Sequence, residues 1–277
     1  MRAFNMPMQE KYVLVTGAYG GMGRAVTAAL TEKGYRVLAL DKRVGEASER
    51  VVPIEADITT ETGVLDALET VKKHTDSLYA ILHFAGIYML DSLVEMDAEA
   101  FRRILDVNFY GAFLINKAFL PLLSKNSRIL ITTSELAPLD PLPFTGVYAV
   151  TKGALDKYAY SLRMELQLLD IPVSVLRAGA VKTGMLGVST DALERFCENT
   201  ALYTCNAKRF HSIVNRVEAR CVAPEKIARK TLKIMEKRKP RFAYSINRNP
   251  LLLLLNCLPK RVQLFAIRMV LRTKEEK

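Results

Sequence analysis

Tyr148 and Lys152 stand four positions apart in the segment Tyr-Ala-Val-Thr-Lys. On a helix, residues four apart lie on one face, so the phenol and the ammonium would sit close together. A nearby positive charge favours phenolate and lowers the pKa of a phenol from its usual value of about 10. Such a tyrosine can give a proton to a carbonyl oxygen or take one from an alcohol. The pair alone is equally compatible with an exposed, solvated helix face.

A glycine-rich segment stands where a phosphate group could be held. An apolar run over 12–15 predicts a buried strand, and residues 24–30 predict a helix. The segment between them is Gly17-Ala18-Tyr19-Gly20-Gly21-Met22-Gly23. Glycines at this junction let backbone N–H groups approach phosphate oxygens, and the helix N-terminus adds its positive end. The flanking strand and helix favour a dinucleotide site over a Gly-rich surface turn.

Asp41 follows a second predicted strand over 36–40 and lies 24 residues after Gly17. A carboxylate near this spacing accepts hydrogen bonds from the adenosine ribose and repels a 2′-phosphate. The sequence therefore favours NAD over NADP. Lys42 and Arg43 follow directly, however, and their positive charges could offset that repulsion.

Two further strand ends are expected to face the same cofactor. The strand over 51–55 ends near the adenine position, and the continuous apolar run over 77–84 is typical of a central parallel strand buried on both faces. The residues that follow these two strands are Asp57-Ile58 and Ala85-Gly86. The first pair could meet the adenine, and the second offers backbone with little side chain against the cofactor.

Asn108 and Ser134 are polar residues at informative places. Asn108 falls in the middle of a helical pattern over 98–120, where Asn is a poor helix former. Its side chain either distorts the helix and binds water or is a satisfied buried polar group. Ser134 emerges from a strand over 128–133 at the edge where doubly wound sheets bind ligands.

The whole set, in this order and spacing, resembles the classical short-chain dehydrogenases/reductases over residues 11–247. Strands and helices alternate throughout, which favours a single-domain doubly wound α/β (Rossmann) fold with a parallel sheet of about seven strands. A basic and apolar helical extension is expected over 248–277. Its composition looks like that of the hydroxysteroid and retinol dehydrogenase branch of the family.

The resemblance implies a role for each residue of the site. Tyr148 would be the general acid/base, and Lys152 would lower its pKa and hold the nicotinamide ribose. Ser134 would hydrogen-bond the substrate oxygen, and Asn108 would hold a water of a proton relay. The implied cofactor-binding residues are Gly17, Tyr19, Gly20, Gly21, Met22, Gly23, Asp41, Asp57, Ile58, Ala85, Gly86, Tyr148, Lys152, Gly179, Val181 and Thr183.

The chain departs from the family pattern at a few positions. Phe84 stands for the usual Asn before Ala-Gly, and Ala178 stands for the usual Pro before Gly179. Gly20 occupies a position where many NADP-dependent members carry a basic or hydroxyl residue, which again suits NAD. Ser134 precedes Tyr148 by fourteen positions, one more than is common.

Residues 184–222 are expected to form a lid over the substrate. They contain few acids and no cluster of guanidinium groups, so a mostly apolar pocket and a lipophilic alcohol or ketone are expected. The same side chains could simply pack on the core. They are Met185, Leu186, Leu193, Phe196, Leu202, Tyr203, Phe210 and Ile213.

Composition adds further expectations. The 277 residues, half of them apolar and a quarter charged, suit one large globular domain. Residues 1–10 hold no apolar block that would predict a signal peptide. Cys197, Cys205, Cys221 and Cys257 form no C-x-x-C pair, so free thiols in a reducing, cytoplasmic compartment are expected rather than zinc or disulfides. The scattered His74, His83 and His211 are expected to be structural or solvated.

The net charge of +11 resides entirely in residues 225–277, which hold 15 Lys and Arg against 4 Asp and Glu. No sequence motif supports nucleic-acid binding. Residues 249–271 are too interrupted to span a bilayer, and their apolar stripes with basic flanks suit a segment at a membrane surface. Covering the substrate mouth or a subunit contact is the competing role. The family resemblance implies a homodimer or homotetramer through the helices bearing Asn108 and Tyr148.

The function expected from the sequence is an NAD-preferring oxidoreductase that interconverts a secondary alcohol and a ketone on a lipophilic molecule such as a steroid. An NADPH-dependent carbonyl or 3-oxoacyl-type reductase is the alternative within the same class. A catalytically idle dinucleotide-binding regulator is the alternative from another class.

Overall fold

A seven-stranded parallel sheet forms the centre of the computed structural model, which describes residues 10–218 and 221–272. The strands are β1 (Tyr12–Thr16), β2 (Arg36–Asp41), β3 (Val51–Glu55), β4 (Leu78–His83), β5 (Leu123–Ser134), β6 (Val173–Ala178) and β7 (Ala243–Ile246). Their order is β3-β2-β1-β4-β5-β6-β7, and every neighbouring pair is parallel. The order therefore reverses between β1 and β4, the place where such sheets bind ligands. The predicted doubly wound fold is confirmed.

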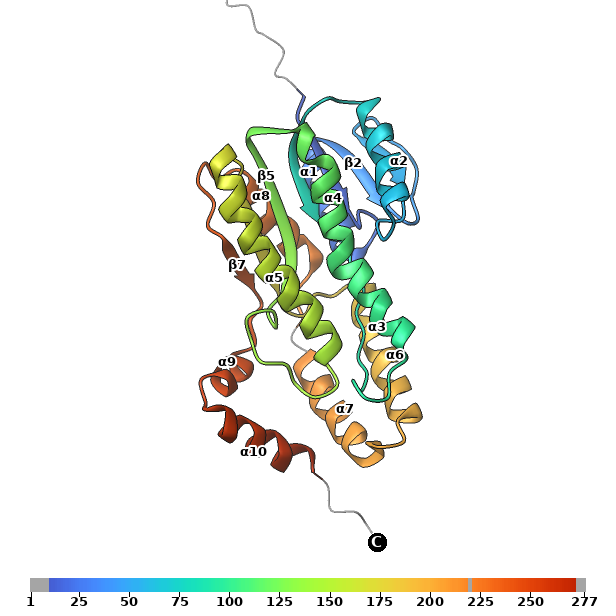
Figure 1. Ribbon diagram of the computed structural model, residues 1–277, viewed down its shortest axis with the longest axis vertical. Helices are drawn as coiled ribbons and strands as arrows, with labels where there is room; N and C mark the ends of the chain where they lie inside the picture. The colour runs from blue at the N-terminus through green and yellow to red at the C-terminus, as the bar shows by residue number, and fades with distance from the viewer. Residues whose placement is uncertain (1–9, 219–220, 273–277) are drawn as a thin grey trace, which may run out of the picture.

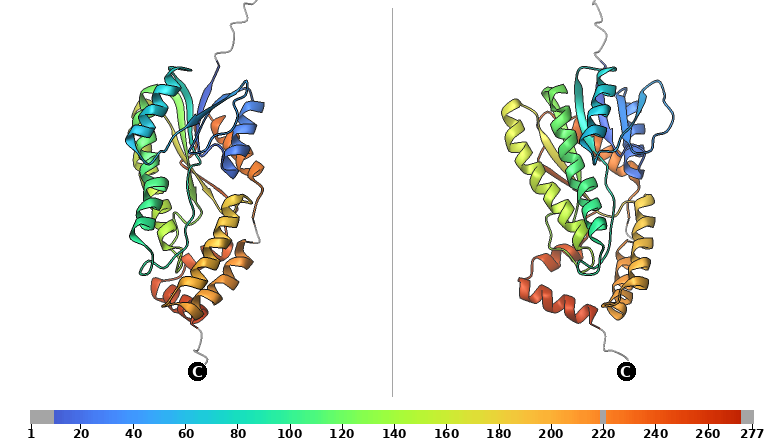
Figure 2. Two further views of the ribbon diagram at one scale, coloured as in Figure 1. Left: turned by 90° about the vertical axis from the view of Figure 1, so that its right-hand side faces the viewer. Right: turned by 45° about the vertical axis from the view of Figure 1, so that its right-hand side comes forward.

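Helices cover both faces of the sheet (Figures 1 and 2). They are α1 (Gly21–Glu32), α2 (Glu61–Lys72), α3 (Ala98–Leu105), α4 (Gly111–Phe119), α5 (Gly146–Leu166), α6 (Gly184–Asn199), α7 (Thr204–Glu218), α8 (Pro224–Met235), α9 (Pro250–Asn256) and α10 (Lys260–Leu271). Helices α2, α4 and α5 pack on one face, and α1 and α8 pack on the other. Within residues 10–218 and 221–272, no helix combines the length and apolar character needed to cross a membrane.

Alternating side chains of the strands fill two separate cores. On β1, Val13 and Val15 pack with α1 and α8, whereas Leu14 packs with the helices of the opposite face. Successive side chains of a strand point to opposite faces, so a strand covered on both sides reads as a continuous apolar run. Pro53, which has no N–H to donate, lies in β3 at the edge of the sheet.

Four helices lie beyond the carboxyl ends of the strands, at the lower end of Figure 1. The stretch predicted as a lid forms α6 and α7, whose side chains build a small core of their own. Phe144, in the loop before α5, contacts Phe196 in a tilted arrangement with ring centroids 4.5 Å apart, which connects this helix pair to that loop. The predicted C-terminal helical extension is α9 and α10, which lie next to the same end of the sheet.

Candidate active site

Tyr148 and Lys152 lie on the first turns of α5; the side chain of Lys152 is buried, and Tyr148 is half-buried at the wall of a cavity. The Lys152 Nζ stands 5.8 Å from the centroid of the Tyr148 ring. It donates one long hydrogen bond of 3.5 Å to the backbone oxygen of Thr132, on β5. Burial of the ammonium lowers the pKa of Lys152 to about 8. The exposed-face interpretation of the pair is thus excluded by its position between α5 and the sheet.

The pKa of Tyr148 differs from the sequence-based expectation. Burial raises this pKa above its ordinary value, and the neighbouring Tyr88 acts in the same direction. A hydrogen bond with Ser134 lowers it only in part. Lys152 is not among the groups that shift the phenol, so desolvation outweighs the expected effect of the ammonium. A phenol in this environment keeps its proton at neutral pH, the form that can donate to a carbonyl oxygen.

Ser134 is the last residue of β5 and is buried beside Tyr148. Its Oγ accepts a hydrogen bond of 3.2 Å from the backbone N–H of Leu136, which fixes the serine at the strand end. The fourteen-residue spacing to Tyr148 is taken up by the loop between β5 and α5. The two hydroxyl groups therefore meet although the spacing is longer than usual for the resembled family.

Asn108 lies in a π-helical turn, Asp106–Tyr110, which separates α3 from α4 where the sequence pattern suggested one long helix. Its Oδ1 accepts from the N–H of Ile87 at 2.8 Å, and its Nδ2 donates to the Ile87 oxygen at 2.9 Å. Nδ2 also contacts Thr151 Oγ1 at 3.2 Å. The helix is distorted at Asn108 and the buried amide is satisfied by protein groups, whereas the water expected at this side chain stays a prediction.

Asn108 and Lys152 both lie close to Gly86. A Cβ on Gly86 would stand 3.2 Å from the Asn108 Oδ1 and 3.3 Å from the Lys152 Nζ. Among the described residues, the Thr132 oxygen is the one hydrogen-bond acceptor recorded for this buried ammonium. An ammonium has three donors, so hydroxyl groups such as those of a ribose would satisfy the remaining two.

The glycine segment joins β1 to α1 with very close backbone packing. Gly17 adopts φ +67°, and a Cβ there would stand 2.5 Å from the backbone nitrogen of Ala85. A Cβ on Gly23 would stand 2.0 Å from the Gly17 oxygen. No side chain caps the N-terminus of α1, whose N-cap residue is Gly20. The open N–H groups and the positive helix end fit the diphosphate of a dinucleotide.

Asp41 and Asp57 both lie at the expected strand ends but have different surroundings. The carboxylate of Asp41 accepts from the backbone N–H groups of Tyr19 and Lys42, at 2.9 and 2.8 Å. The carboxylate of Asp57 pairs with Lys42 Nζ at 2.8 Å and accepts from Thr59, which lowers its pKa to about 2. The Lys42 ammonium thus forms an ion pair with Asp57. Ile58 is buried against α4.

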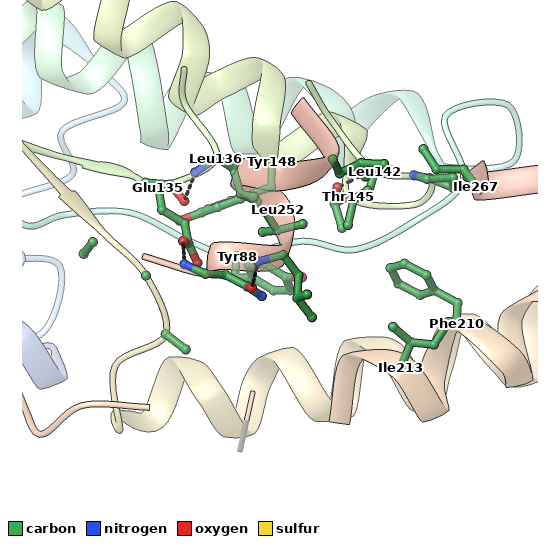
Figure 3. Close-up of a pocket in the computed structure, with 18 of the residues that line it drawn as sticks. Tyr88, Glu135, Leu136, Leu142, Thr145, Tyr148, Phe210, Ile213, Leu252 and Ile267 are labelled. Atoms are coloured by element: carbon green, nitrogen blue, oxygen red, sulfur yellow. Dashed lines mark hydrogen bonds between the residues drawn. The ribbon is translucent and has the colours of Figure 1, made fainter. Parts of the chain in front are cut away.

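An apolar cavity of about 400 Å³ lies in front of Tyr148 and Ser134. Figure 3 shows Phe210 and Ile213 of α7 projecting toward it, with Leu252 of α9 and Ile267 of α10 on other sides. Its wall toward the glycine segment is made by Met22, Gly179, Val181 and Thr183. The substrate space and the expected cofactor site are therefore contiguous.

The predicted lid residues divide between several roles. Phe210 and Ile213 line the cavity, Leu193 and Phe196 are buried in the core of the lid, and Leu202 is exposed. Tyr203 lines a neighbouring groove. The side chains of Met185 and Leu186 lie outside the described residues. The sequence had left open, for each of them, whether it lines the substrate pocket or packs on the core.

Three contributors to the cavity were missed or left open by sequence reasoning. The ring of Tyr88 contacts that of Tyr148 in a tilted arrangement, with ring centroids 4.9 Å apart. Glu135 follows Ser134 directly, and its Oε2 accepts from the N–H of Asn249 at 2.6 Å. Burial raises the pKa of Glu135, although the Asn249 N–H and the charge of Arg248 oppose the shift. The third contributor is the pair α9 and α10, where the covering role expected as one alternative is observed.

Other candidate groups do not form a second site in the described part of the chain. No cluster there of three or more His, Cys, Asp and Glu residues could hold a metal ion. Cys197, Cys221 and Cys257 are free thiols, and the Cys205 side chain lies outside the described residues. His83 is buried, with its Nε2 2.9 Å from the Asn116 Oδ1, which fits the expected structural role.

Comparisons with known proteins agree with this geometry. A model of the short chain dehydrogenase family matches residues 11–194. Mouse estradiol 17-beta-dehydrogenase 2 is 34% identical over 66% of this chain and 51% of that protein. An NADPH-dependent 1-acyldihydroxyacetone phosphate reductase of Schizosaccharomyces pombe is 31% identical over 66% of this chain and 65% of that protein. The chain thus spans about half to two thirds of the length of these curated relatives.

Solved structures show the same fold. A short chain dehydrogenase from Burkholderia cenocepacia in complex with NADP superimposes with a TM-score of 0.71. The match covers 97% of this chain and 100% of that one at 22% sequence identity. It extends the structural likeness well beyond residue 194, into the lid and the C-terminal helices.

Proposed function

The chain belongs to the short-chain dehydrogenase family, and on that premise we propose that it is an NAD(P)-dependent oxidoreductase. Its proposed reaction interconverts a secondary alcohol and a ketone on a neutral, lipophilic molecule such as a hydroxysteroid. The observation that carries this proposal is the placement of Tyr148 and Ser134 on one wall of an apolar cavity, with the buried Lys152 behind them.

The site residues have distinct proposed roles. A bound nicotinamide would supply or accept the hydride. Tyr148 gives its proton to the ketone oxygen in reduction and takes the proton of the alcohol in oxidation. Ser134 hydrogen-bonds the same substrate oxygen and lowers the pKa of Tyr148. Lys152 holds the ribose next to the nicotinamide, and Asn108 fixes the backbone at Ile87 and stands beside the lysine.

The remaining cofactor contacts are proposed from the same geometry. The N–H groups at the N-terminus of α1, which no side chain caps, would hold the diphosphate. The Thr183 side chain packs beside this end of the helix: a Cβ on Gly21 would stand 2.4 Å from the Thr183 Cβ. Asp41 receives the adenosine ribose, and its charge favours NAD over NADP.

Replacing Asp41 with Ala should reduce the preference for NAD, which initial rates with both cofactors would measure. An unchanged ratio of the rates would remove Asp41 from cofactor selection.

A neutral substrate is supported by the cavity lining. The described lining residues include no Lys, Arg or His, and their one carboxylate belongs to Glu135. A phosphate or carboxylate on the substrate would therefore lack a cationic partner and meet a negative charge. This lining argues against a phosphate ester such as the 1-acyldihydroxyacetone phosphate named for the Schizosaccharomyces pombe relative, although NADPH-dependent reduction of a neutral ketone stays a candidate.

Tyr148→Phe tests the proposal directly. The variant keeps the ring but loses the proton, so turnover should fall by at least about a thousandfold while cofactor affinity stays within about twofold. Wild type and variant would be compared by nicotinamide absorbance over a panel of steroids, retinoids and fatty alcohols, and by calorimetric titration with NAD. A fully active variant would exclude this mechanism. A wild type that binds NAD but turns over nothing would favour the catalytically idle regulator.

Assembly and location form the last part of the proposal. Homodimers or homotetramers are proposed through α4 and α5, which expose Phe113, Val150, Tyr160 and Met164, with Tyr110 of the π-helical turn beside them. We place the protein in the cytoplasm, with peripheral membrane contact through residues 249–271. The proposed organisation is one catalytic domain over 11–247, with a lid over 184–222 and the extension over 248–277.

A further inference from the structure

The C-terminal hairpin, defined as α9, α10 and the turn between them, forms one wall of the active-site cavity. Its lining residues are Leu251, Leu252, Leu255, Ala266, Ile267, Val270 and Leu271. On α10 these positions are separated by one, three or four residues, so they share one face of the helix. A second cavity of about 480 Å³ lies beside α10 and shares Pro143, Ile267 and Leu271 with the first. Helix α10 thus stands between the active site and an open groove.

The opposite face of the hairpin is apolar as well, and it is exposed. Leu264, Phe265 and Met269 of α10 are 68%, 65% and 59% exposed, and Leu254 of α9 is 64% exposed. A helix of a soluble protein normally places polar side chains on the face turned away from the core. An apolar face of this kind marks a contact with another apolar phase or surface.

Positive charge is interleaved with these apolar side chains. Helical spacing places Arg261 and Arg268 on the same outer face as Leu264 and Phe265. Residues 249–272 contain no Asp or Glu. Lys260 pairs with Asp140 of the loop before α5, whereas no ion pair is recorded for the two arginines within the described residues. Leu and Phe side chains between unpaired cations suit the interface of an anionic lipid layer.

Polar contacts hold the hairpin to the rest of the molecule at its start, middle and end. At its start, the carboxylate of Glu135 accepts from the N–H of Asn249 at 2.6 Å. In the middle, Asn256 Oδ1 accepts from the N–H of Asp140 at 2.7 Å. At its end, Asn206 Nδ2 of α7 donates to the Leu271 oxygen at 2.7 Å. These contacts attach the hairpin to the residues around the cavity opening, and we call the hairpin the roof of the cavity. The last strand of the sheet ends before the hairpin, at Ile246.

We propose that the outer face of this roof rests on an anionic lipid surface and that a neutral lipophilic substrate passes from the lipid into the active site beside α10. The inference rests on the proposed oxidoreductase function and specifies the face that contacts lipid and the route of the substrate. The proposal rests on α10, whose inner face lines the cavity and whose outer face is exposed. A substrate on this route never has to cross water.

The lipid contact can be tested without turnover because the chain contains no Trp. A single reporter would be introduced as Phe265→Trp on the outer face, with Leu65→Trp on the exposed side of α2 as the control. Both would be mixed with phosphatidylcholine vesicles that contain phosphatidylserine and a brominated lipid. Emission of the Phe265→Trp protein should be quenched by at least about half and that of the control should not. Equal emission changes in the two proteins would overturn the proposal.

The charge requirement is tested on the same vesicles. Each of Arg261→Gln and Arg268→Gln should weaken binding to phosphatidylserine vesicles by about fivefold, and neither should matter on pure phosphatidylcholine. If the Phe265→Trp protein shows the emission of a buried Trp in the absence of vesicles, and light scattering gives twice the monomer mass, a second copy of the chain covers this face. That result would also overturn the proposal.

The route is tested with Leu264→Ser/Phe265→Ser, whose matched control is Leu168→Ser/Leu169→Ser at the far end of α5. Oxidation of 2-dodecanol dissolved in the vesicles should fall more than about tenfold in the first variant, because two side chains lose their lipid contact. Oxidation of water-soluble 2-butanol should be unchanged in both variants. Equal rates of all three proteins on 2-dodecanol would contradict the route. Absence of turnover with either alcohol would instead count against the oxidoreductase proposal, and the quenching result would still decide the lipid contact.

Discussion

At the scale of single residues, burial decides the chemistry of the site more than pairwise charge does. The sequence pattern suggested a phenol acidified by an ammonium one helical turn away. In the structure both groups are desolvated, so the pKa of Tyr148 rises and that of Lys152 falls to about 8. At neutral pH the phenol is therefore protonated and can donate a proton. Alcohol oxidation would need the phenolate, which is scarce at that pH.

Ser134 is the group that opposes this shift, which leads to a pH prediction. Ser134→Ala removes a hydrogen bond that lowers the pKa of Tyr148, so that pKa should rise by about one to two units. The pH profile of kcat/KM for alcohol oxidation should move to higher pH by the same amount. Steady-state rates between neutral and strongly alkaline pH would show it. A profile that stays in place or moves to lower pH would contradict this role.

Glu135 lies in the cavity wall next to the proposed reacting centre, and its carboxylate should select against anionic substrates. Glu135→Gln keeps an oxygen for the Asn249 N–H but removes the charge. We expect the preference for 4-dodecanone over 4-oxododecanoate to fall by about tenfold in this variant. The readout is kcat/KM for each ketone. Thr145→Val, another change in the cavity wall, should leave the preference unchanged.

At the scale of elements, close contacts between loops set the shape of the cofactor site. The glycine turn lies directly on the segment after β4, and the Thr183 side chain packs beside the start of α1. These contacts join segments from β1, β4 and β6, which are far apart in the chain. A methyl group can therefore block the site without touching any catalytic residue.

Gly21→Ala is the sharpest test at this scale. The new Cβ would stand 2.4 Å from the Thr183 Cβ, so Thr183 would have to move away from the end of α1. Overpacking of this kind costs about 1–3 kcal/mol, which should weaken NAD binding by about 5- to 150-fold. Calorimetric titration measures the change. Gly184→Ala adds the same methyl group where nothing lies within 4 Å, and it should bind NAD normally.

A buried hydrogen-bonded chain ties β4 to α4 and α5. His83 on β4 meets Asn116, whose Nδ2 donates to the Tyr158 hydroxyl at 3.2 Å. Burial, together with the charge of Lys152, lowers the pKa of His83 to about 4, although Asn116 opposes the shift. The network therefore contains a neutral imidazole and links the sheet behind the active site to the helices of the proposed subunit contact.

The depressed pKa of His83 makes stability dependent on pH. The unfolded chain binds a proton below about pH 6.5, whereas the folded protein does so only near pH 4. The free energy of unfolding should therefore fall as pH decreases through this window, by about 3 kcal/mol in total. His83→Gln should remove most of that slope. Urea unfolding at pH values across the window measures it, and equal slopes in both proteins would assign the effect to other groups.

At the scale of the whole molecule, two surfaces are left for partners. The lower pole carries the roof hairpin, and the side of the molecule carries the exposed apolar residues of α4 and α5 (Figure 1). The two surfaces belong to different elements and serve different proposed contacts, lipid and a second subunit. A dimer through α4 and α5 would leave the hairpins of both subunits exposed.

The subunit contact has its own test. Phe113→Glu/Met164→Glu places two charges in the proposed interface and should convert an oligomer to monomers, because a buried unpaired charge costs several kcal/mol. Light scattering with size exclusion reports the mass. Leu65→Glu, on the exposed side of α2, is the control and should leave the mass unchanged. A monomeric wild type would exclude this oligomer.

The order of local patterns along the chain was enough to predict the fold. Apolar runs, their turns and the alternation with helices depend on neighbouring residues, so the sheet, Gly17, Asn108, Ser134 and Tyr148 could be placed from spacing alone. Helix 98–120 shows the limit of that approach. Its π-helical turn arises because Asn108 bonds to Ile87, a residue that no local pattern connects to it.

Quantities that depend on long-range packing were decided only by the tertiary structure. The pKa of Tyr148 follows from how completely the cavity walls exclude water, and those walls come from α5, α7, α9 and α10 together. Likewise, the apolar runs after residue 249 fitted both a membrane segment and a cover for the site. The folded chain gives α10 one face on the cavity and one face outside, because only three-dimensional packing determines which side of a helix is covered.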